Sequence, residues 1–242
     1  MKTCKSIYIA GSGGKTTLSF WMADWAKQQG KRAVVLTTTH MMAEEGCILY
    51  TGNPSEWKKS LKRKLDEEGL AQTGVPVKAG KITWIGEVLY KEVQKMADVI
   101  FIEADGSKRL PAKMPNASEP VIFPDADAIY VVFGLSAVGK PIHEICHRYE
   151  LADFLIEETL TEESAAKLLN NGYVDPLQKK YPQTPVTVVL NQADDDKIKV
   201  MGETIAEQIA CPVQIISLKG GMKGWENETK RNLSKIMGTI KE

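Results

Sequence analysis

Cysteine is scarce in this sequence, positive and negative charges balance, and long apolar runs are missing. Cys4, Cys47, Cys146 and Cys211 include no C-x-x-C pair, which argues against a disulfide framework or a zinc ribbon. Lys and Arg number 31, as do Asp and Glu, so no overall bias points to nucleic acid or an anionic membrane. No apolar run approaches the roughly 20 residues that span a bilayer. We therefore expect a cytoplasmic protein with reduced thiols, no membrane span and no nucleic-acid partner.

The sequence does contain an alternation of apolar strand-like runs and helical patterns. After the first run, Leu18, Trp21, Met22 and Trp25 recur at the spacing of one helix face. The strand-like runs, rich in β-branched residues, lie at 6–10, 33–39, 98–106, 128–135, 185–191 and 212–218. This alternation predicts an α/β, three-layer P-loop NTPase fold, with a mostly parallel sheet and helices on both faces.

Segments with less regular patterns interrupt the alternation of strands and helices within what we expect to be one domain. We expect a single domain over residues 1–242, with an insertion at about 41–83 after the second strand. The insertion holds a charge-dense helical segment, "SEWKKSLKRKLDEEG", and then a turn and short strand. The stretch 144–180 is predicted to be helical, with Thr161 as an N-cap. A final helix is predicted from the apolar spacing within 233–240.

The stretch "IYIAGSGGKTT" at 7–17 predicts a phosphate-binding loop, although Ile9 stands where the strict G-x-x-x-x-G-K-[ST] pattern needs glycine. A strand precedes it and an amphipathic helix follows, so backbone N–H groups and a helix N-terminus can converge on an anion. Lysine can reach the β- and γ-phosphates, and the threonine after it can place a hydroxyl on Mg²⁺. The predicted nucleotide-binding residues of the loop are Gly11, Ser12, Gly13, Gly14, Lys15, Thr16 and Thr17.

A second motif, "VIFIEADGSKR", ends a predicted strand in two carboxylates. Glu103 and Asp105 alternate along the chain, so both side chains can point the same way at the end of the strand. A strand of this kind beyond a phosphate loop holds the second Mg²⁺ carboxylate in nucleoside triphosphatases. We therefore predict a metal site from Thr16, Glu103 and Asp105, without deciding which carboxylate lies closer.

A third motif, "VVLNQADD", follows the form of the [NT]-K-x-D motif that reads guanine in GTPases. Asn191 and Asp194 fit the motif, whereas Gln192 replaces the usual lysine. An aspartate accepts two hydrogen bonds from guanine that adenine does not offer in that arrangement. We predict that Asn191 and Asp194 contact the base and that GTP is favoured over ATP.

Histidines supply the remaining candidates. His40 follows three threonines at the end of the second predicted strand, where ligands bind in open α/β sheets. We group it with Lys15 and Asp105 as catalytic candidates. His143, Cys146 and His147 in "HEICHR" have the spacing of metal ligands but lack a fourth member, so metal binding there is left open.

Taken in order, "GSGGKTT", "TTTHM", "EADGSKRLPAKMPNASEPVI", "GLSAVGKPIHEICHR" and "LNQAD" resemble the YqeC-type accessory proteins of selenium-dependent molybdenum hydroxylases. The loop itself is similar to those of partition ATPases, signal-recognition GTPases and nickel- or urease-maturation GTPases. Ala10 stands where some of that class carry a lysine that crosses between subunits, which argues against such a mechanism. The resemblance implies that Lys108, Arg109 and Lys113 present a basic edge to an anionic partner, and that the client is a metalloenzyme or one of its maturation proteins.

Three functions are compatible with these patterns. The first is a client-stimulated, Mg²⁺-dependent nucleoside triphosphatase that uses GTP or ATP and serves hydroxylase maturation. The second is a small-molecule kinase on the same fold, with the basic "GSKRLPAK" loop seating the acceptor. The third is a nucleotide-binding adaptor without turnover. A homodimer is compatible with all three.

Overall fold

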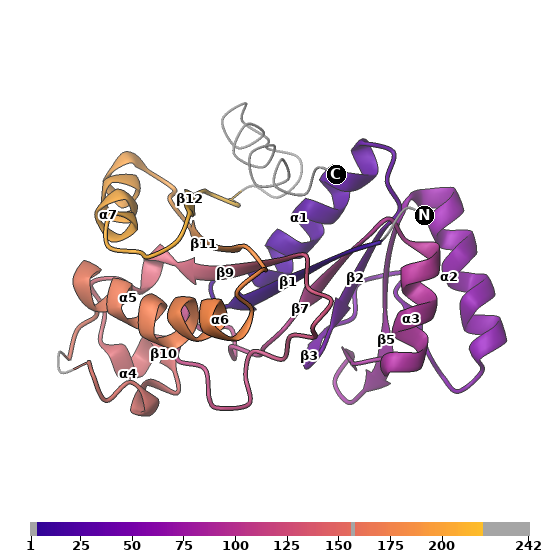
Figure 1. The fold of residues 1–242 in the computed structure, drawn as a ribbon, viewed down its shortest axis with the longest axis horizontal. Coiled ribbons are helices and arrows are strands. Elements are labelled where there is room, and N and C mark those ends of the chain that lie inside the picture. Colours follow the sequence, from indigo (N-terminus) through magenta and orange to yellow (C-terminus); the bar gives the residue numbers. More distant parts are fainter. Residues whose placement is uncertain (1–3, 156–157, 220–242) are drawn as a thin grey trace.

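The computed structural model describes residues 4–155 and 158–219 of the 242-residue chain (Figure 1). Within this part, ten strands form one sheet in the order β12-β11-β9-β1-β7-β2-β5-β6-β3, with β4 paired to β5. The strands are β1 Lys5–Gly11, β2 Ala33–Thr37, β3 His40–Met42, β4 Ile48–Leu49, β5 Leu70–Val77, β6 Lys81–Thr83, β7 Val99–Glu103, β9 Ala128–Gly134, β11 Val186–Asn191 and β12 Val213–Ile215. A second sheet pairs β8 Ala112–Lys113 with β10 Cys146–His147.

Helices cover both faces of the sheet, and the predicted three-layer α/β fold with a mostly parallel sheet is confirmed. Only the β5–β6 and β6–β3 pairings are antiparallel among the sheet pairings of the described residues. The helices are α1 Lys15–Gln28, α2 Pro54–Glu68, α3 Glu87–Met96, α4 Ile142–Ile145, α5 Glu162–Leu169, α6 Asp175–Lys180 and α7 Asp196–Ala206. None of the described helices is long and apolar enough to cross a membrane.

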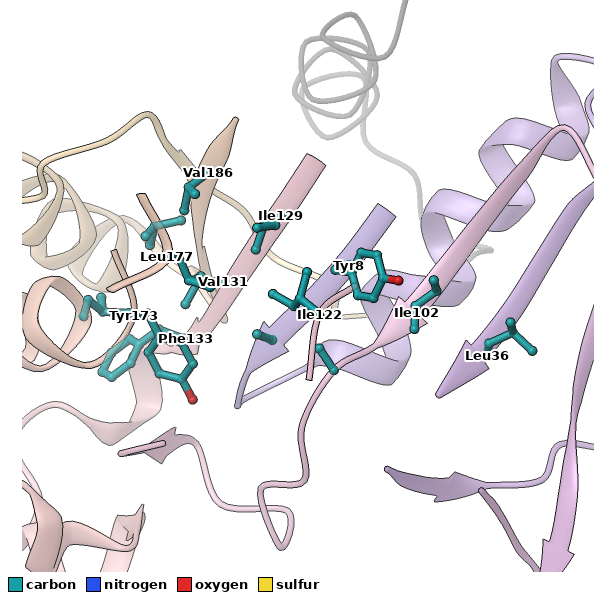
Figure 2. Packing of buried hydrophobic residues seen from close by; sticks show 14 of the residues in the cluster. Tyr8, Leu36, Ile102, Ile122, Ile129, Val131, Phe133, Tyr173, Leu177 and Val186 are labelled. Atoms are coloured by element: carbon teal, nitrogen blue, oxygen red, sulfur yellow. The ribbon is translucent and has the colours of Figure 1, made fainter. Parts of the chain in front are cut away.

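The buried core divides along the two faces of the sheet because side chains alternate along each strand. In β1, Ile7 and Ile9 pack with Leu18 and Met22 of α1. Tyr8 and Ala10 face the other way. That second face is covered by α2 and α3 at one end of the sheet and by α5, α6 and α7 at the other (Figure 1). Figure 2 shows part of this larger cluster, from Leu36 of β2 to Val186 of β11.

Some predicted elements differ from those observed. The segment 41–83, predicted as an insertion, supplies β5, which pairs in parallel with β2 and extends the sheet. The prediction of helix throughout 144–180 was wrong in part, since 146–155 contains β10 and only a single 3₁₀ turn, η2 Tyr149–Leu151. Thr161 does cap α5, in a capping box with Ser164. The helix predicted within 233–240 lies outside the described residues.

The order of the strands places β1 at a reversal of the chain's path. After β1 the chain continues on the β7–β2 side, and β9 and β11 are then added on the opposite side. In open α/β sheets ligands bind at the carboxyl ends of the strands where such a reversal occurs. Gly11 ends β1 at that edge, so the glycine loop lies where a ligand is expected.

Candidate functional site

A cleft of about 900 Å³ opens at the carboxyl ends of the central strands. It is lined by residues 13–17, 39–42, 105–111, 147–148, 191–192 and 218–219, together with Lys81, Glu103, Glu119, Ser136 and Asp194. The cleft therefore brings together the three motifs that the sequence separates: the glycine loop, the acidic strand end and the N-x-x-D segment. Its volume lies within the range of small-molecule sites.

The glycines of the loop are required by close packing against β9. A Cβ atom on Gly11 would lie 2.1 Å from the Val132 carbonyl oxygen, and one on Gly13 would lie 2.4 Å from the Gly134 nitrogen. Both glycines have positive φ, which side chains disfavour. The Ser12 N–H donates to the Val132 carbonyl at 2.8 Å and fixes the loop to the neighbouring strand. The loop is thus held rigidly at the mouth of the cleft.

The N-terminus of α1 has no side-chain cap. Gly14 is the N-cap residue, no side chain accepts a hydrogen bond from the first turn, and no acidic residue lies in that turn. The first N–H groups of a helix have no intrahelical acceptor, and the helix dipole adds partial positive charge there. Lys15, Thr16 and Thr17 of this turn line the cleft. Such an end attracts an anion, phosphate above all.

Lys15 is buried, with 5 % of its side chain exposed, and it lies between the loop and a carboxylate. Its Nζ donates to the Gly11 carbonyl at 2.7 Å and lies 3.2 Å from Asp105 Oδ1. The other carboxylate oxygen, Oδ2, accepts from the Gly11 N–H and the Tyr173 hydroxyl, each at 3.0 Å. Asp105 is fully buried, so these donors offset the cost of removing its charge from water.

Lys113 corrects one expectation from the sequence. It was predicted at a basic edge, but it is fully buried, with its Nζ 3.2 Å from Asp105 Oδ2 and 2.7 Å from Glu119 Oε2. Arg148 pairs with the same Glu119 oxygen. Burial raises the pKa of Glu119, but Lys113 and Arg148 together outweigh it and leave that pKa lowered. Lys113 therefore holds two carboxylates together instead of presenting charge to a partner.

Glu103 differs from Asp105 in forming no ion pair with any described residue. It ends β7 with 4 % exposure, and its Oε1 atom is buried without a hydrogen-bond partner among the described residues. Burial raises its pKa, whereas Lys15 and a hydrogen bond with the Thr16 side chain lower it. Thr16 and Glu103 thus lie together beside the glycine loop. Asp105 Oδ1 also lacks a hydrogen-bond partner, but Asp105 is already paired with the ammonium groups of Lys15 and Lys113. The geometry therefore favours Glu103 as the carboxylate nearer a cation.

Two threonines at the end of β2 and just after it form hydrogen bonds with backbone carbonyl groups. Thr37 and Thr38 donate their hydroxyls to the Glu103 carbonyl at 3.1 and 3.3 Å, and Thr38 also donates to Val121 at 3.1 Å. These bonds fix the end of β7, and with it the Glu103 side chain. His40 is exposed at the start of β3 and lines the rim of the cleft.

Asn191 connects the glycine loop to the far wall of the cleft. Its Nδ2 donates to the Gly13 carbonyl at 2.7 Å, and its Oδ1 accepts from the Leu218 N–H at 3.2 Å. The Ser217 hydroxyl donates to Asp194 Oδ1 at 2.5 Å, and Asp194 lines the cleft. Asn191 is therefore a tether of the loop, a role that the motif alone does not predict.

The cluster in "HEICHR" does not assemble. His143 is exposed and contacts Tyr149, whereas Cys146 is buried and donates its Sγ–H to the His147 carbonyl at 3.9 Å. The described residues contain no group of three His, Cys, Asp or Glu side chains arranged to hold a metal ion. His147 instead lines the cleft beside Arg148.

Sequence reasoning missed Tyr173, Glu119, His147 and Arg148 as parts of this site. Tyr173 belongs to a π-helical segment, Asn170–Val174, whose irregular turn follows α5. A π-helical turn is frequent at functional sites, but nothing in the local pattern distinguishes it from an ordinary helix. The "EADGSKRLPAK" block signals a functional segment, without revealing which of its cations is buried.

Comparison with models of protein families shows to which family the chain belongs. The family model described as "YqeC protein" matches residues 7–150, which include the glycine loop, the acidic strand end and the "HEICHR" segment. The chain belongs to the YqeC family. A protein of Escherichia coli (strain K12) described as "Uncharacterized protein YqeC" is 31% identical over 163 residues, in a match that covers 59% of this chain. The match spans 57% of that relative's length.

Among solved structures, one similar chain is the signal recognition particle receptor FtsY from Elizabethkingia anophelis, crystallised in complex with GDP. The match covers 93% of this chain and 52% of that chain, at 12% identity and a TM-score of 0.30. A likeness of that degree supports no conclusion about the ligand of this YqeC-family protein, for which the cleft itself must provide the argument.

Proposed function

We propose that this YqeC-family protein binds a nucleoside triphosphate with Mg²⁺ in the cleft and hydrolyses it. The observation that carries this proposal is the uncapped N-terminus of α1, directly behind the glycine loop and beside the buried Lys15. Amide donors, a helix dipole and an ammonium group converge there on a cleft large enough for a nucleotide. The test is calorimetric titration with GTP and with ATP, each with and without Mg²⁺. No saturable binding of either nucleotide would overturn the proposal.

Thr16 and Glu103 would hold the Mg²⁺ ion. The buried Glu103 Oε1 has no partner in the described part of the chain, and Thr16 lies beside it. Mg²⁺ in such sites takes one or two protein oxygens together with water and phosphate oxygens, so a large cluster of acidic ligands is unnecessary. When bound, the ion neutralises charge on the phosphates.

Replacing Glu103 with glutamine is expected to weaken Mg²⁺-dependent nucleotide binding by about tenfold or more, because a charged metal ligand is lost. The measurement is the nucleotide Kd in Mg²⁺ and in EDTA; in the variant the two values should converge. Glu87→Gln on α3, whose side chain is 75% exposed, is the matched control and should retain the full Mg²⁺ dependence. An unchanged ratio in Glu103→Gln would show that the metal lies elsewhere.

GTP is the proposed nucleotide, read by Asp194. Its carboxylate lines the cleft next to the Asn191 tether, within the segment that resembles a guanine-reading motif. Asp194→Asn is expected to weaken GTP by about tenfold or more and to favour xanthosine triphosphate, since a bond to a charged group is exchanged. A competition panel of GTP, ATP and xanthosine triphosphate measures the preference. If the order of affinities stays the same, Asp194 does not read the base.

Hydrolysis would rely on positioning and on charge neutralisation by Lys15, the α1 amides and the metal. The catalytic candidates Asp105 and His40 take different parts: Asp105 orients Lys15, and His40 lies at the rim, where it can contact water. Turnover is proposed to be slow until a client, a selenium-dependent molybdenum hydroxylase or its maturation proteins, is present. The resemblance of the "EADGSKRLPAK" block to YqeC-type accessory proteins supports this choice of client. Phosphate release measured with and without client tests it, and separates a triphosphatase from an adaptor.

A small-molecule kinase is the second candidate. The observation in its favour is that the cleft continues past the glycine loop to Lys108, Arg109 and Arg148, leaving space for an acceptor. Product analysis distinguishes the two activities, because a kinase transfers the γ-phosphoryl group to a metabolite and a triphosphatase releases it as inorganic phosphate.

A further inference from the structure

Backbone strain gathers among the residues that line the cleft. Five described residues other than glycine have positive φ, and four of them line this cleft: Lys108 at 49°, Arg109 at 65°, Arg148 at 63° and Gln192 at 73°. Only Ala79 lies elsewhere. Side chains disfavour such dihedrals, and strained residues cluster at ligand sites, where the surrounding structure maintains them. Two consecutive strained residues, Lys108 and Arg109, point to a loop shaped for a ligand.

Three of these four residues are basic, and they give the cleft an excess of positive charge. Lys108 and Arg109 are exposed and form no ion pair with any described residue. Arg148 has one partner, Glu119, and that carboxylate is already shared with Lys113. Lys113 itself is neutralised by buried carboxylates, so it does not add to the excess. Two unpaired cations and a partly paired guanidinium therefore face one space.

His147 gives a separate observation at this place. It pairs with Lys113 across the β10–β8 ladder, and its Nδ1 atom is buried without a hydrogen-bond partner in the part of the chain that is described. A buried polar atom left unpaired costs free energy. Burial lowers the pKa of His147, and Arg148, Lys113 and Lys108 lower it further, which keeps the ring neutral near pH 7. A neutral imidazole can donate one hydrogen bond without adding to the positive charge.

We propose that Lys108, Arg109, His147 and Arg148 form a second anion subsite, which binds a small molecule carrying a phosphate or carboxylate group beside the nucleotide. Guanidinium groups bind both groups through paired N–H donors, and the strained loop holds Arg109 toward the cleft. This proposal rests on the proposed function in one respect only, namely that the neighbouring ligand is a nucleotide. The four side chains of the subsite lie outside the glycine loop in the sequence, so filling that loop with a nucleotide leaves them available to a second ligand.

The test is a calorimetric titration of the full chain, saturated with the β,γ-imido analogue of GTP and Mg²⁺, with inorganic phosphate and, separately, with malonate. Ionic strength is held constant. Filling the glycine loop with the analogue removes it as a binding site for the added anion. We expect saturable binding of one anion per chain, and the titrant that binds more tightly identifies the chemical group.

Arg109→Ala is expected to weaken this binding at least about tenfold, since one charge-assisted pair is lost. Arg63→Ala, at an exposed position of α2 outside the cleft, should leave it unchanged. Absence of saturable binding of both anions, or equal affinities in the two variants, would overturn the proposal. If the GTP analogue fails to bind, the same comparison in a Lys15→Ala background still tests the subsite, so its failure is distinguishable from failure of the proposed function.

Discussion

Replacing Lys113 with methionine is expected to lower the free energy of unfolding by about 3 kcal/mol or more. Methionine keeps much of the length of the side chain, so the change removes mainly the charge. Asp105 and Glu119 would each lose an ammonium partner, at 3.2 and 2.7 Å, and the side chain of Asp105 is fully buried. Breaking a buried ion pair from one side costs more than the pair itself contributes, because the remaining charge is left buried.

Urea denaturation followed by tryptophan fluorescence measures this change. Lys62→Met provides the control: Lys62 pairs with Asp66 at 2.5 Å, but the two side chains are 64% and 45% exposed. Exposed pairs contribute about 0–1 kcal/mol, so that variant should unfold almost as the parent does. Equal denaturation midpoints for Lys113→Met and Lys62→Met would show that Lys113 is dispensable for stability.

The importance of Lys113 follows from its place in a continuous series of charges. Lys15, Asp105, Lys113, Glu119 and Arg148 alternate in sign and are each within ion-pairing distance of the next. The series runs from the glycine loop to the proposed second subsite. Each member is paired with the next one in the series. The effects on stability of changes at the two ends are therefore expected to be coupled rather than additive.

Local patterns were sufficient to predict six strands of the sheet (β1, β2, β7, β9, β11 and β12), the position of the glycine loop and the meeting of three motifs at one edge. Strand and helix periodicity is a property of a few neighbouring residues, and parallel strands carry their following loops to the same edge. The glycine loop was therefore correctly placed despite Ile9, since the strand and helix around it provide the context. Thr161 as a cap was predicted for the same reason.

The charges inside the site could not be predicted this way. Lys113 belongs to a segment that reads as a basic surface loop. Its carboxylate partners Asp105 and Glu119 are in turn held by Tyr173 and Arg148, which come from separate parts of the fold. The Tyr173 hydroxyl reaches Asp105 across 68 positions of sequence. Such contacts are set by the tertiary arrangement, which no local periodicity encodes. The same reason explains why Glu103 and Asp105 could not be ranked as metal ligands beforehand.

Lys15→Ala is expected to weaken nucleoside triphosphate binding by about 10- to 100-fold, through loss of one hydrogen bond between charged groups. The fold should persist, because Asp105 keeps the Gly11 N–H, the Tyr173 hydroxyl and Lys113 as partners. Fluorescence titration with an N-methylanthraniloyl derivative of GTP in Mg²⁺ measures affinity, and far-ultraviolet circular dichroism checks the fold.

Lys27→Ala is the matched control for this variant. Lys27 is a lysine of the same helix, exposed in its last turn and outside the cleft. It experiences the same helix propensity change as Lys15, so any difference between the variants reports the site rather than the helix. Nucleotide affinity should fall only in Lys15→Ala. If both variants bind the GTP derivative as the parent does, the uncapped end of α1 does not hold the phosphates, and the cleft must serve a different ligand.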